Sequence, residues 1–311
     1  MITDTTTLYL YVETPLHAGV GSGLSSIDLP IQRERTTQYP MIQGSGIKGK
    51  LRATAEDAVQ KKTFLQEDTD ILFGPSTNTS NAKNKTTATS NDHAGALIAG
   101  DARILLFPVR SLNGVFAYTT SYDVLSRFKR DVERGNMTQK PDWNVPNPVP
   151  DKALVTTTSE IHTNNTIVLE EFSFDTQADT QVDTIAKWIA DYALPDLGVG
   201  DYWSNKIKNS LVILPNDDFR DFALYATEVI TRVRIKRETK TVEGGALWTE
   251  EHLPTDTLLY VPMYATNARK KDVSISADQV LAKIKALDTK YLQLGGDETV
   301  GRGLVRIKWG S

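Results

Sequence analysis

The sequence predicts an α+β fold, built as one elaborated domain over residues 1–311. Strand-like and helix-like segments interleave without a strict strand–helix repeat, which disfavours a doubly wound parallel sheet. The chain is long enough to bury a sizeable core, and its apolar and charged fractions of 40% and 24% are those of an ordinary globular protein. One domain with insertions is therefore favoured over a string of modules.

Strands are predicted where apolar residues alternate with polar ones or form a short run between turn residues. The first such segment runs from Thr6 to Thr14 and stops at Pro15. The same pattern predicts strands at residues 96–110, 165–174, 291–294 and 304–309.

Helices are predicted where apolar residues recur with helical spacing. In residues 179–193, Val182, Ile185 and Ile189 fall on one side. Helical segments are also predicted at residues 47–62, 121–135, 220–229 and 278–290. The polar, low-complexity residues 76–95 predict a mobile loop, and four prolines in residues 141–151 exclude regular structure there.

A long β-hairpin is predicted in the C-terminal half, over about residues 229–264. Residues 231–240 alternate apolar Val233 and Ile235 with basic side chains, and residues 256–265 also suit a strand. We expect these two segments to pair, with Trp248 in an elaborate tip between them.

Composition excludes several classes of protein. There is no cysteine, which removes disulfides, thiolate metal sites and cysteine nucleophiles. The four histidines lie far apart without the spacing of a zinc enzyme. No apolar run approaches the roughly 20 residues that span a bilayer, and the N-terminus lacks a basic start followed by an apolar stretch. We therefore expect a cytoplasmic protein without a membrane partner.

The net charge of −4 gives no overall basic surface, so a polyanion must be bound by local patches. One candidate is the loop that contains Gly295, Gly296, Gly301 and Gly303 around Arg302. Glycines leave backbone N–H groups uncovered for a phosphate, and the arginine adds a charge-assisted contact. The spacing matches neither a Rossmann nor a P-loop site. A plain turn between two strands is the alternative interpretation.

Lys48 and Arg52 form a second candidate anion site. They are four residues apart and share one helical face near the N-terminal end, where free N–H groups and the helix dipole favour anions. A merely solvated basic face is the alternative.

The third candidate is a basic segment at residues 232–240, which carries five positive charges and one negative charge. Such a strand could follow a nucleic-acid backbone, and Trp248 could insert between bases. An exposed strand protected by its charges against edge pairing is the alternative. The positive residues are Arg232, Arg234, Lys236, Arg237 and Lys240.

Asp28 is the candidate catalytic residue. His17 ends a strand, a Gly/Ser-rich loop follows it, and Asp28 stands two residues before Pro30. A loop aspartate can position a hydrated divalent ion, or orient a ribose 2′-hydroxyl for attack on its own phosphate. A capping or turn residue is the alternative.

Three segments together resemble a known family. Residues 16–52 (LHAGVGSGLSSIDLPIQRERTTQYPMIQGSGIKGKLR), RIKRETKTVEGGALWTEEHLP in the middle and LGGDETVGRG near the end are similar to the RAMP superfamily, specifically to backbone subunits of type III-B CRISPR Cmr effector complexes. The resemblance implies an RRM-like, ferredoxin-type palm with helical finger insertions and a β-hairpin thumb. It also implies several copies in a helical filament along one CRISPR RNA, beside other subunits of the complex.

The resemblance further implies cleavage of complementary single-stranded target RNA at regular intervals, with a divalent metal ion, Mg²⁺ or Mn²⁺. It assigns catalysis and metal positioning to Asp28, with His17 and a thumb glutamate as helpers. Glu243 is the best match for that glutamate and Glu238 the next. RNA contacts fall on Lys48, with Arg52 one turn on, and on the glycine loop. Sequence specificity would then come from base pairing with the guide.

Two alternatives stay open at this point. The first is a related Csm-type subunit, or a catalytically silent relative that only binds guide RNA. The second is a metabolic α+β enzyme for a small phosphorylated ligand, which leaves the basic hairpin unexplained.

Overall fold

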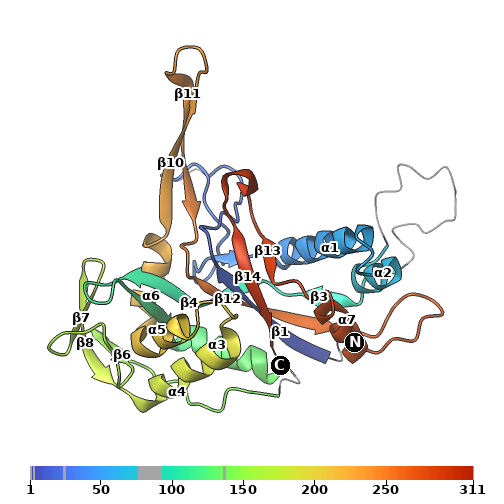
Figure 1. Cartoon of the computed structure of the whole chain (residues 1–311). Helices are drawn as coiled ribbons and strands as arrows, with labels where there is room; N and C mark the ends of the chain where they lie inside the picture. The colour runs from blue at the N-terminus through green and yellow to red at the C-terminus, as the bar shows by residue number, and fades with distance from the viewer. Residues whose placement is uncertain (1, 3, 24–25, 76–92, 136–137, 311) are drawn as a thin grey trace.

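The computed structural model describes residues 2, 4–23, 26–75, 93–135 and 138–310, and these form an α+β fold (Figure 1). Residues 76–92 of the predicted mobile loop lie outside the described residues. One 12-stranded sheet runs through the molecule, and a separate two-stranded hairpin projects from it. Among the described helices, none is both long and apolar enough to cross a bilayer.

The large sheet is mixed but mostly antiparallel, with parallel pairing only at β5–β9 and β6–β8 among its described pairs. Its order is β13-β14-β1-β12-β4-β5-β9-β6-β8-β7, with β2 beside β4 and β3 beside β12. The strands are β1 (Asp4–Val12), β2 (Met41–Ile42), β3 (Leu97–Ala99), β4 (Ala102–Arg110), β5 (Phe116–Ser121), β6 (Lys152–Val155), β7 (Thr166–Leu169), β8 (Phe172–Ala178), β9 (Leu211–Leu214), β12 (Leu258–Ala265), β13 (Tyr291–Gln293) and β14 (Leu304–Trp309).

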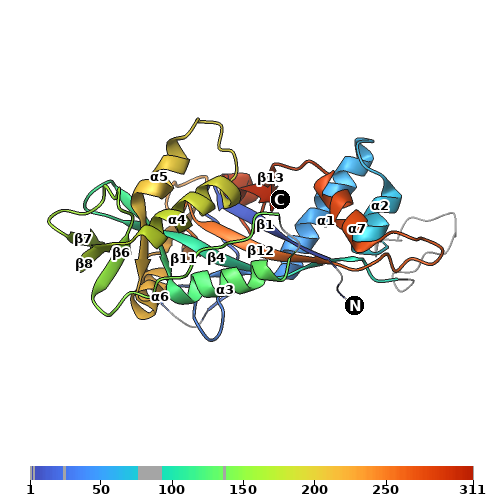
Figure 2. The same ribbon diagram turned by 90° about the horizontal axis from the view of Figure 1, so that it is seen from below.

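The helices gather in two groups at opposite ends of the sheet (Figures 1 and 2). One group contains α1 (Gly44–Gln60), α2 (Gln66–Phe73) and α7 (Ala277–Lys285). The other contains α3 (Tyr122–Glu133), α4 (Thr180–Trp188), α5 (Tyr202–Ser210) and α6 (Asn216–Tyr225). A π-helical turn, η1 (Ile189–Ala193), continues α4.

The core lies on both faces of the sheet, and strand periodicity explains why. On β1, Leu8 and Leu10 pack into one buried cluster, whereas Tyr9 and Tyr11 pack into another. β12 is apolar at almost every position and is likewise buried on both faces. Strands of this kind belong in the interior of a covered sheet, because either face would otherwise expose apolar surface.

Most predicted segments are confirmed near their predicted positions, and two predicted strands are divided. Residues 96–110 form β3 and β4, which separate at Gly100. The Gly100 N–H donates to the Pro262 carbonyl, and a Cβ there would crowd that carbonyl. Residues 165–174 contain β7 and the start of β8, joined through Glu170 at a φ of 50°. Residues 141–151 contain no helix or strand, as their prolines predict. The elements β2, β5, β6, β9, α2 and α5 were not predicted.

The predicted hairpin pairing is wrong. β10 (Glu228–Ile235) pairs with β11 (Val242–His252), not with residues 256–265, which form β12 between β1 and β4. Gly244 and Gly245, in the segment predicted to be an elaborate tip, lie inside β11, opposite a register shift between Val233 and Ile235. Glycines inside a strand commonly mark such a bulge. β12 joins the large sheet because its apolar run needs cover on both faces.

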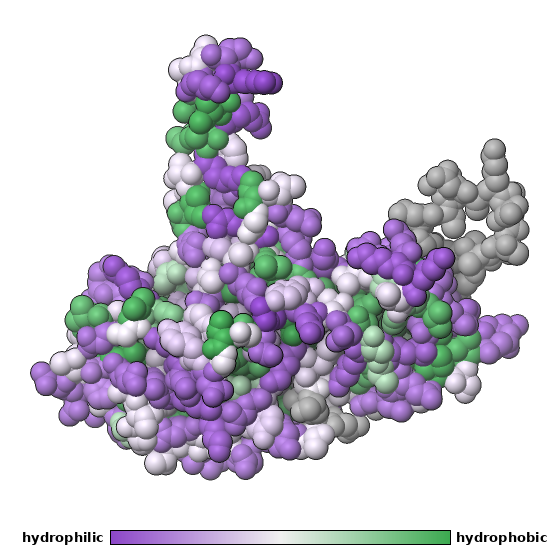
Figure 3. Space-filling view, viewed as in Figure 1, coloured by the Kyte–Doolittle hydropathy of each residue, from purple (hydrophilic) through white to green (hydrophobic). Residues whose placement is uncertain are grey.

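Trp248 is therefore not at the tip of the hairpin. It pairs with Arg232 near the base, and the tip consists of residues 236–241. Cross-strand partners share a face, so Val233 with Leu247 and Ile235 with Val242 form an exposed apolar side of the stem. Figure 3 shows apolar side chains along this stem below a hydrophilic tip.

Candidate functional site

Asp28 lies against the base of the β10–β11 hairpin. Its Oδ2 accepts hydrogen bonds from the Thr249 backbone N–H at 2.8 Å and from Thr249 Oγ1 at 3.0 Å. The next residue, Leu29, forms a parallel bridge with Glu250, so the loop runs beside β11 like a short additional strand. The hydrogen bonds from the Thr249 backbone and side chain lower the pKa of Asp28 below its usual range. This carboxylate is exposed and ionised at neutral pH.

Asp28 borders an open hollow of about 340 Å³. Arg234 and Trp248 line it from the hairpin, and Ser22, Gly23 and Leu29 line it from the loop. Three residues that the sequence analysis selected separately thus meet here. An ionised carboxylate, a guanidinium and an indole ring around one hollow can hold a phosphate and a stacked base.

His17 is held beside the same part of the hairpin. Its Nδ1 lies 2.7 Å from the Glu251 carbonyl oxygen, and its ring centroid lies 5.4 Å from that of His252. Gly19 leaves room for the His17 ring, because a Cβ there would lie 2.5 Å from Nε2. The fixed Nδ1 leaves Nε2 as the nitrogen that can exchange a proton with a ligand.

Glu243 lies farther along β11 than Thr249, the residue that holds Asp28. It precedes Thr249 by six residues, but the register shift shortens that span, because Thr249 pairs with Thr231 and Val242 pairs with Ile235, only four residues farther along β10. Its nearest charged partner is Arg234, with an Nη1–Oε2 distance of 3.8 Å. Because Arg234 also lines the hollow beside Asp28, the helper role of Glu243 stays a prediction.

Two carboxylates near the base of the hairpin, Glu250 and Asp297, were missed by sequence reasoning. Arg232 Nη1 lies 2.8 Å from Glu250 Oε2 and 2.8 Å from Asp297 Oδ1. Trp248 Nε1 donates to Glu250 Oε1 at 2.6 Å, and buried His252 lies beside both acids. The available signal was the two-residue spacing of Trp248, Glu250 and His252, which places them on one face of a strand.

The glycine loop between β13 and β14 is explained mainly by backbone geometry. Gly295, Gly301 and Gly303 have φ values of 77°, 79° and 72°, which favour glycine. Side chains at Gly295 and Gly303 would collide with the carbonyl oxygens of His17 and Leu294. The N–H groups of Gly296, Gly301 and Gly303 donate to backbone carbonyls, so these three amides are not free for a phosphate.

Arg302 lies close enough to two titratable groups to change their pKa values. It offsets part of the burial that raises the pKa of Glu228, and it adds to the burial that lowers the pKa of His252. Within the described residues, no ion pair of the Arg302 side chain is found. Its positive charge at the hairpin base stays available to an anion.

Lys48 and Arg52 lie on α1, at the other end of the sheet from α3–α6 (Figure 1). Burial first, and then the neighbouring Arg269 and Arg52, lower the pKa of Lys48. Arg52 pairs with Glu56 at 2.8 Å. An anion beside Lys48 would relieve the repulsion between these cations. Lys236 and Arg237 project from the exposed hairpin tip.

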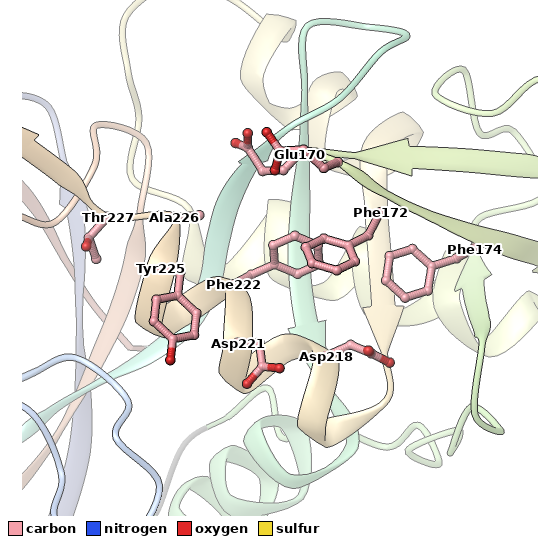
Figure 4. A pocket seen from close by; sticks show the side chains of 10 residues that line it. Glu170, Phe172, Phe174, Asp218, Asp221, Phe222, Tyr225, Ala226 and Thr227 are labelled. Carbon is pink, nitrogen blue, oxygen red and sulfur yellow. The ribbon is translucent and has the colours of Figure 1, made fainter.

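A larger hollow of about 490 Å³ lies between β8 and α6. Figure 4 shows Phe172, Phe174 and Phe222 gathered there, with Asp218 and Asp221 below them. Burial, with the repulsion of neighbouring aspartates, raises the pKa of Asp218. No residue selected from the sequence lines this pocket, and its acidic lining disfavours RNA phosphates.

A hairpin projecting from a mixed sheet, with a carboxylate, basic side chains and an indole at its base, is the arrangement of a nucleic-acid-handling protein. The sequence matches the RAMP superfamily model over residues 9–306, so the chain belongs to the RAMP superfamily. It is 40% identical to the CRISPR system Cmr endoribonuclease Cmr4 of Pyrococcus furiosus over 304 residues, 96% of this chain and 93% of that protein. It is 25% identical to the CRISPR system CMR subunit Cmr4 of Saccharolobus solfataricus, over 96% and 95% of the two chains.

Solved structures agree with this assignment. The fold is similar to that of oligomeric Cmr4 from Pyrococcus furiosus, with a TM-score of 0.71, 32% identity and coverage of 99% and 98% of the two chains. A chain of the type III-B Cmr-beta complex bound to cognate target RNA has the same fold, with a TM-score of 0.68 and 19% identity. The alignment covers 99% of this chain and 98% of that chain.

Proposed function

We propose that this chain is a Cmr4-type backbone subunit of a type III-B Cmr effector complex, and that it cleaves complementary target RNA within that complex. The observation that carries the proposal is Asp28, ionised and fixed by Thr249 beside Arg234 and Trp248. The extensive similarity to a Cmr endoribonuclease supports it. Partners are CRISPR RNA, single-stranded target RNA, further copies of the chain and other Cmr subunits.

In this proposal the large sheet is an RRM-like palm, the helical groups form fingers, and the β10–β11 hairpin is the thumb. The apolar side of its stem, with Val233 and Leu247, suits unstacked bases, whereas the basic tip suits a phosphate backbone. A hairpin inserted into a guide–target duplex frees the target strand locally. The 2′-hydroxyl beside the hairpin can then reach the in-line geometry that an A-form helix prevents.

Asp28 is the group that touches the reacting atoms. Oδ2 accepts both Thr249 hydrogen bonds, so the carboxylate has a fixed orientation at the border of the hollow. Asp28 fits a divalent ion of the Mg²⁺ type, which commonly uses one carboxylate together with water and substrate phosphate oxygens. Such an ion supplies charge stabilisation at the scissile phosphate. His17 Nε2 is the group placed to move a proton.

The test is Asp28→Asn in the assembled complex, with target cleavage and target binding measured separately. We expect single-turnover cleavage to fall at least about a hundredfold while target affinity changes less than about twofold, because the carboxylate acts on the transition state. Asp272→Asn is the matched control, since Asp272 is an exposed loop aspartate elsewhere in the chain. Undiminished cleavage by Asp28→Asn would remove Asp28 from the mechanism and favour a subunit that only binds guide RNA.

A further inference from the structure

Three potential metal ligands converge at the base of the β10–β11 hairpin, apart from Asp28. Glu250 and His252 stand two residues apart on one face of β11, and Asp297 comes from the loop between β13 and β14. One ligand atom from each residue lies within 4.8 Å of the other two. His252 Nε2 is 3.9 Å from Glu250 Oε2 and 4.0 Å from Asp297 Oδ2.

His252 is the independent observation that points to a ligand. The residue is 1% exposed, and within the described part of the chain neither ring nitrogen has a hydrogen-bond partner. An unpartnered polar group in such surroundings has an appreciable free-energy cost, so buried nitrogens are nearly always bonded. Nε2 faces two carboxylates across a gap too long for a hydrogen bond and suited to an ion between them.

The charges of the cluster also suit a cation. Glu250 and Asp297 share one arginine partner, Arg232, so two carboxylates face a single guanidinium.

We propose that Glu250, His252 and Asp297 form a divalent-cation site that binds Mn²⁺ in preference to Mg²⁺. Glu250 Oε2 and Asp297 Oδ2 lie 3.9 and 4.0 Å from His252 Nε2, and one ligand atom from each residue lies within 4.8 Å of the others. Donors at such separations can hold a central ion at about 2.3–2.5 Å, the range for divalent ions with mixed nitrogen and oxygen ligands. An imidazole ligand suits Mn²⁺ better than Mg²⁺, which prefers oxygen and shorter bonds. The bound ion links β11 to the loop between β13 and β14 and fixes the base of the hairpin.

The effect of removing Arg232 on ion affinity distinguishes this site from an ordinary cluster of acidic residues. Its Nη1 contacts the same Glu250 oxygen that lies nearest His252, so the guanidinium and the ion compete for this carboxylate. Removal of the guanidinium should therefore strengthen ion binding. In a site held together by Arg232 alone, the same change would leave Mn²⁺ affinity unchanged or reduce it.

The first experiment titrates the full-length chain with Mn²⁺ and measures free Mn²⁺ by its room-temperature EPR signal. We expect one Mn²⁺ per chain, binding at least tenfold weaker in Asp297→Asn, and at least threefold tighter in Arg232→Ala. Asp297 has a φ of 62°, which asparagine tolerates, so this variant keeps the loop conformation. Asp272→Asn, also at a positive φ, is the control and should bind like wild type. Equal affinities in wild type and Asp297→Asn overturn the proposal.

The second experiment identifies the nitrogen ligand and separates this site from Asp28. Pulsed EPR of the Mn²⁺-loaded chain should detect nitrogen coupling that is lost in His252→Gln and kept in His17→Gln. Mn²⁺ binding should be unchanged in Asp28→Asn. Loss of binding in Asp28→Asn would place the ion at Asp28 and overturn this site while leaving the proposed function intact. Thermal unfolding verifies that each variant is folded. If His252→Gln does not fold, the Mn²⁺ affinity of Asp297→Asn tests the site.

Discussion

Single hydrogen bonds determine the position of Asp28. A loop aspartate usually samples several rotamers, but here Thr249 supplies both a backbone and a hydroxyl donor to one carboxylate oxygen. The backbone donor belongs to a strand and cannot move independently of it. The position of the carboxylate thus depends on the hairpin, although the residue itself is sixteen residues after Val12, where β1 ends.

Thr249→Val tests this dependence without changing the shape of the side chain. The variant loses the hydroxyl donor and keeps the backbone donor, so we expect cleavage in the assembled complex to fall about fivefold, with target affinity unchanged. Thr231→Val is the control, because Thr231 stands directly opposite Thr249 on β10. A rate equal to wild type would mean that the backbone N–H alone orients Asp28.

His252 predicts how stability depends on pH. Its folded-state pKa is lowered below its usual value, so the folded state binds a proton less readily than the unfolded chain does. Stability linked to His252 is therefore present above about pH 6.5 and is lost as the pH falls toward the folded-state pKa. We expect the free energy of unfolding, measured with urea in metal-free buffer, to fall less between about pH 7.5 and 5.5 in His252→Gln than in wild type. An identical fall in both proteins would contradict this.

At the scale of elements, the loop between β13 and β14 acts as a support for the hairpin base. Gly296 donates to the His17 carbonyl and Gly303 to the Pro15 carbonyl, which fixes the chain that follows β1 against this loop. Asp297 in the same loop reaches Arg232 on β10. The loop therefore connects the chain around His17 to the hairpin, and its glycines are required by this close packing.

Gly295→Ala and Gly301→Ala separate crowding from backbone strain. Both glycines have positive φ, but only at Gly295 would a Cβ meet the His17 backbone, whereas Gly301 has open space. We expect Gly301→Ala to lower the free energy of unfolding by about 1 kcal/mol and Gly295→Ala by more than about 2 kcal/mol. Chemical denaturation measures both, and equal losses would mean that the loop moves away from His17 at little cost.

At the scale of the whole molecule, positive charge is placed locally on an acidic chain. Lys48 lies on α1, Arg302 lies at the hairpin base, and the tip carries further basic residues. The acidic pocket between β8 and α6 lies in the other half of the sheet. This distribution suits a protein that holds one RNA along a defined track without adhering to nucleic acids in general.

Lys48→Ala combined with Arg302→Ala tests that track. If each side chain neutralises one RNA phosphate, the slope of log affinity against log salt should become shallower by the contribution of about two phosphate contacts. The change should not depend on the guide sequence. Filter binding across a salt series measures the slope. Lys61→Ala with Lys62→Ala is the control, because both lysines are exposed at the C-terminal end of α1. A slope that the double variant leaves unchanged would mean that Lys48 and Arg302 face only solvent.

Sequence alone determined most of the elements and the identity of the principal candidate residue. Strand and helix periodicities depend on neighbours a few residues apart, so segments such as β1, α3 and α7 were predictable from local pattern. Asp28, His17, Arg234 and Trp248 were selected from motifs and family resemblance, and the structure brings three of them to one hollow.

Only the tertiary structure decided which strands pair and which acids meet. β10 faced two possible partners, and the choice of β11 depends on the need of β12 for cover on both faces, a property of the whole sheet. Glu250 and His252 share a local spacing, but Asp297 reaches them from a loop 45 residues beyond His252. The periodicity of residues within a segment shows which face of the strand or helix a side chain occupies. It does not show which residues contact that face, because those contacts are set by packing between segments far apart in sequence.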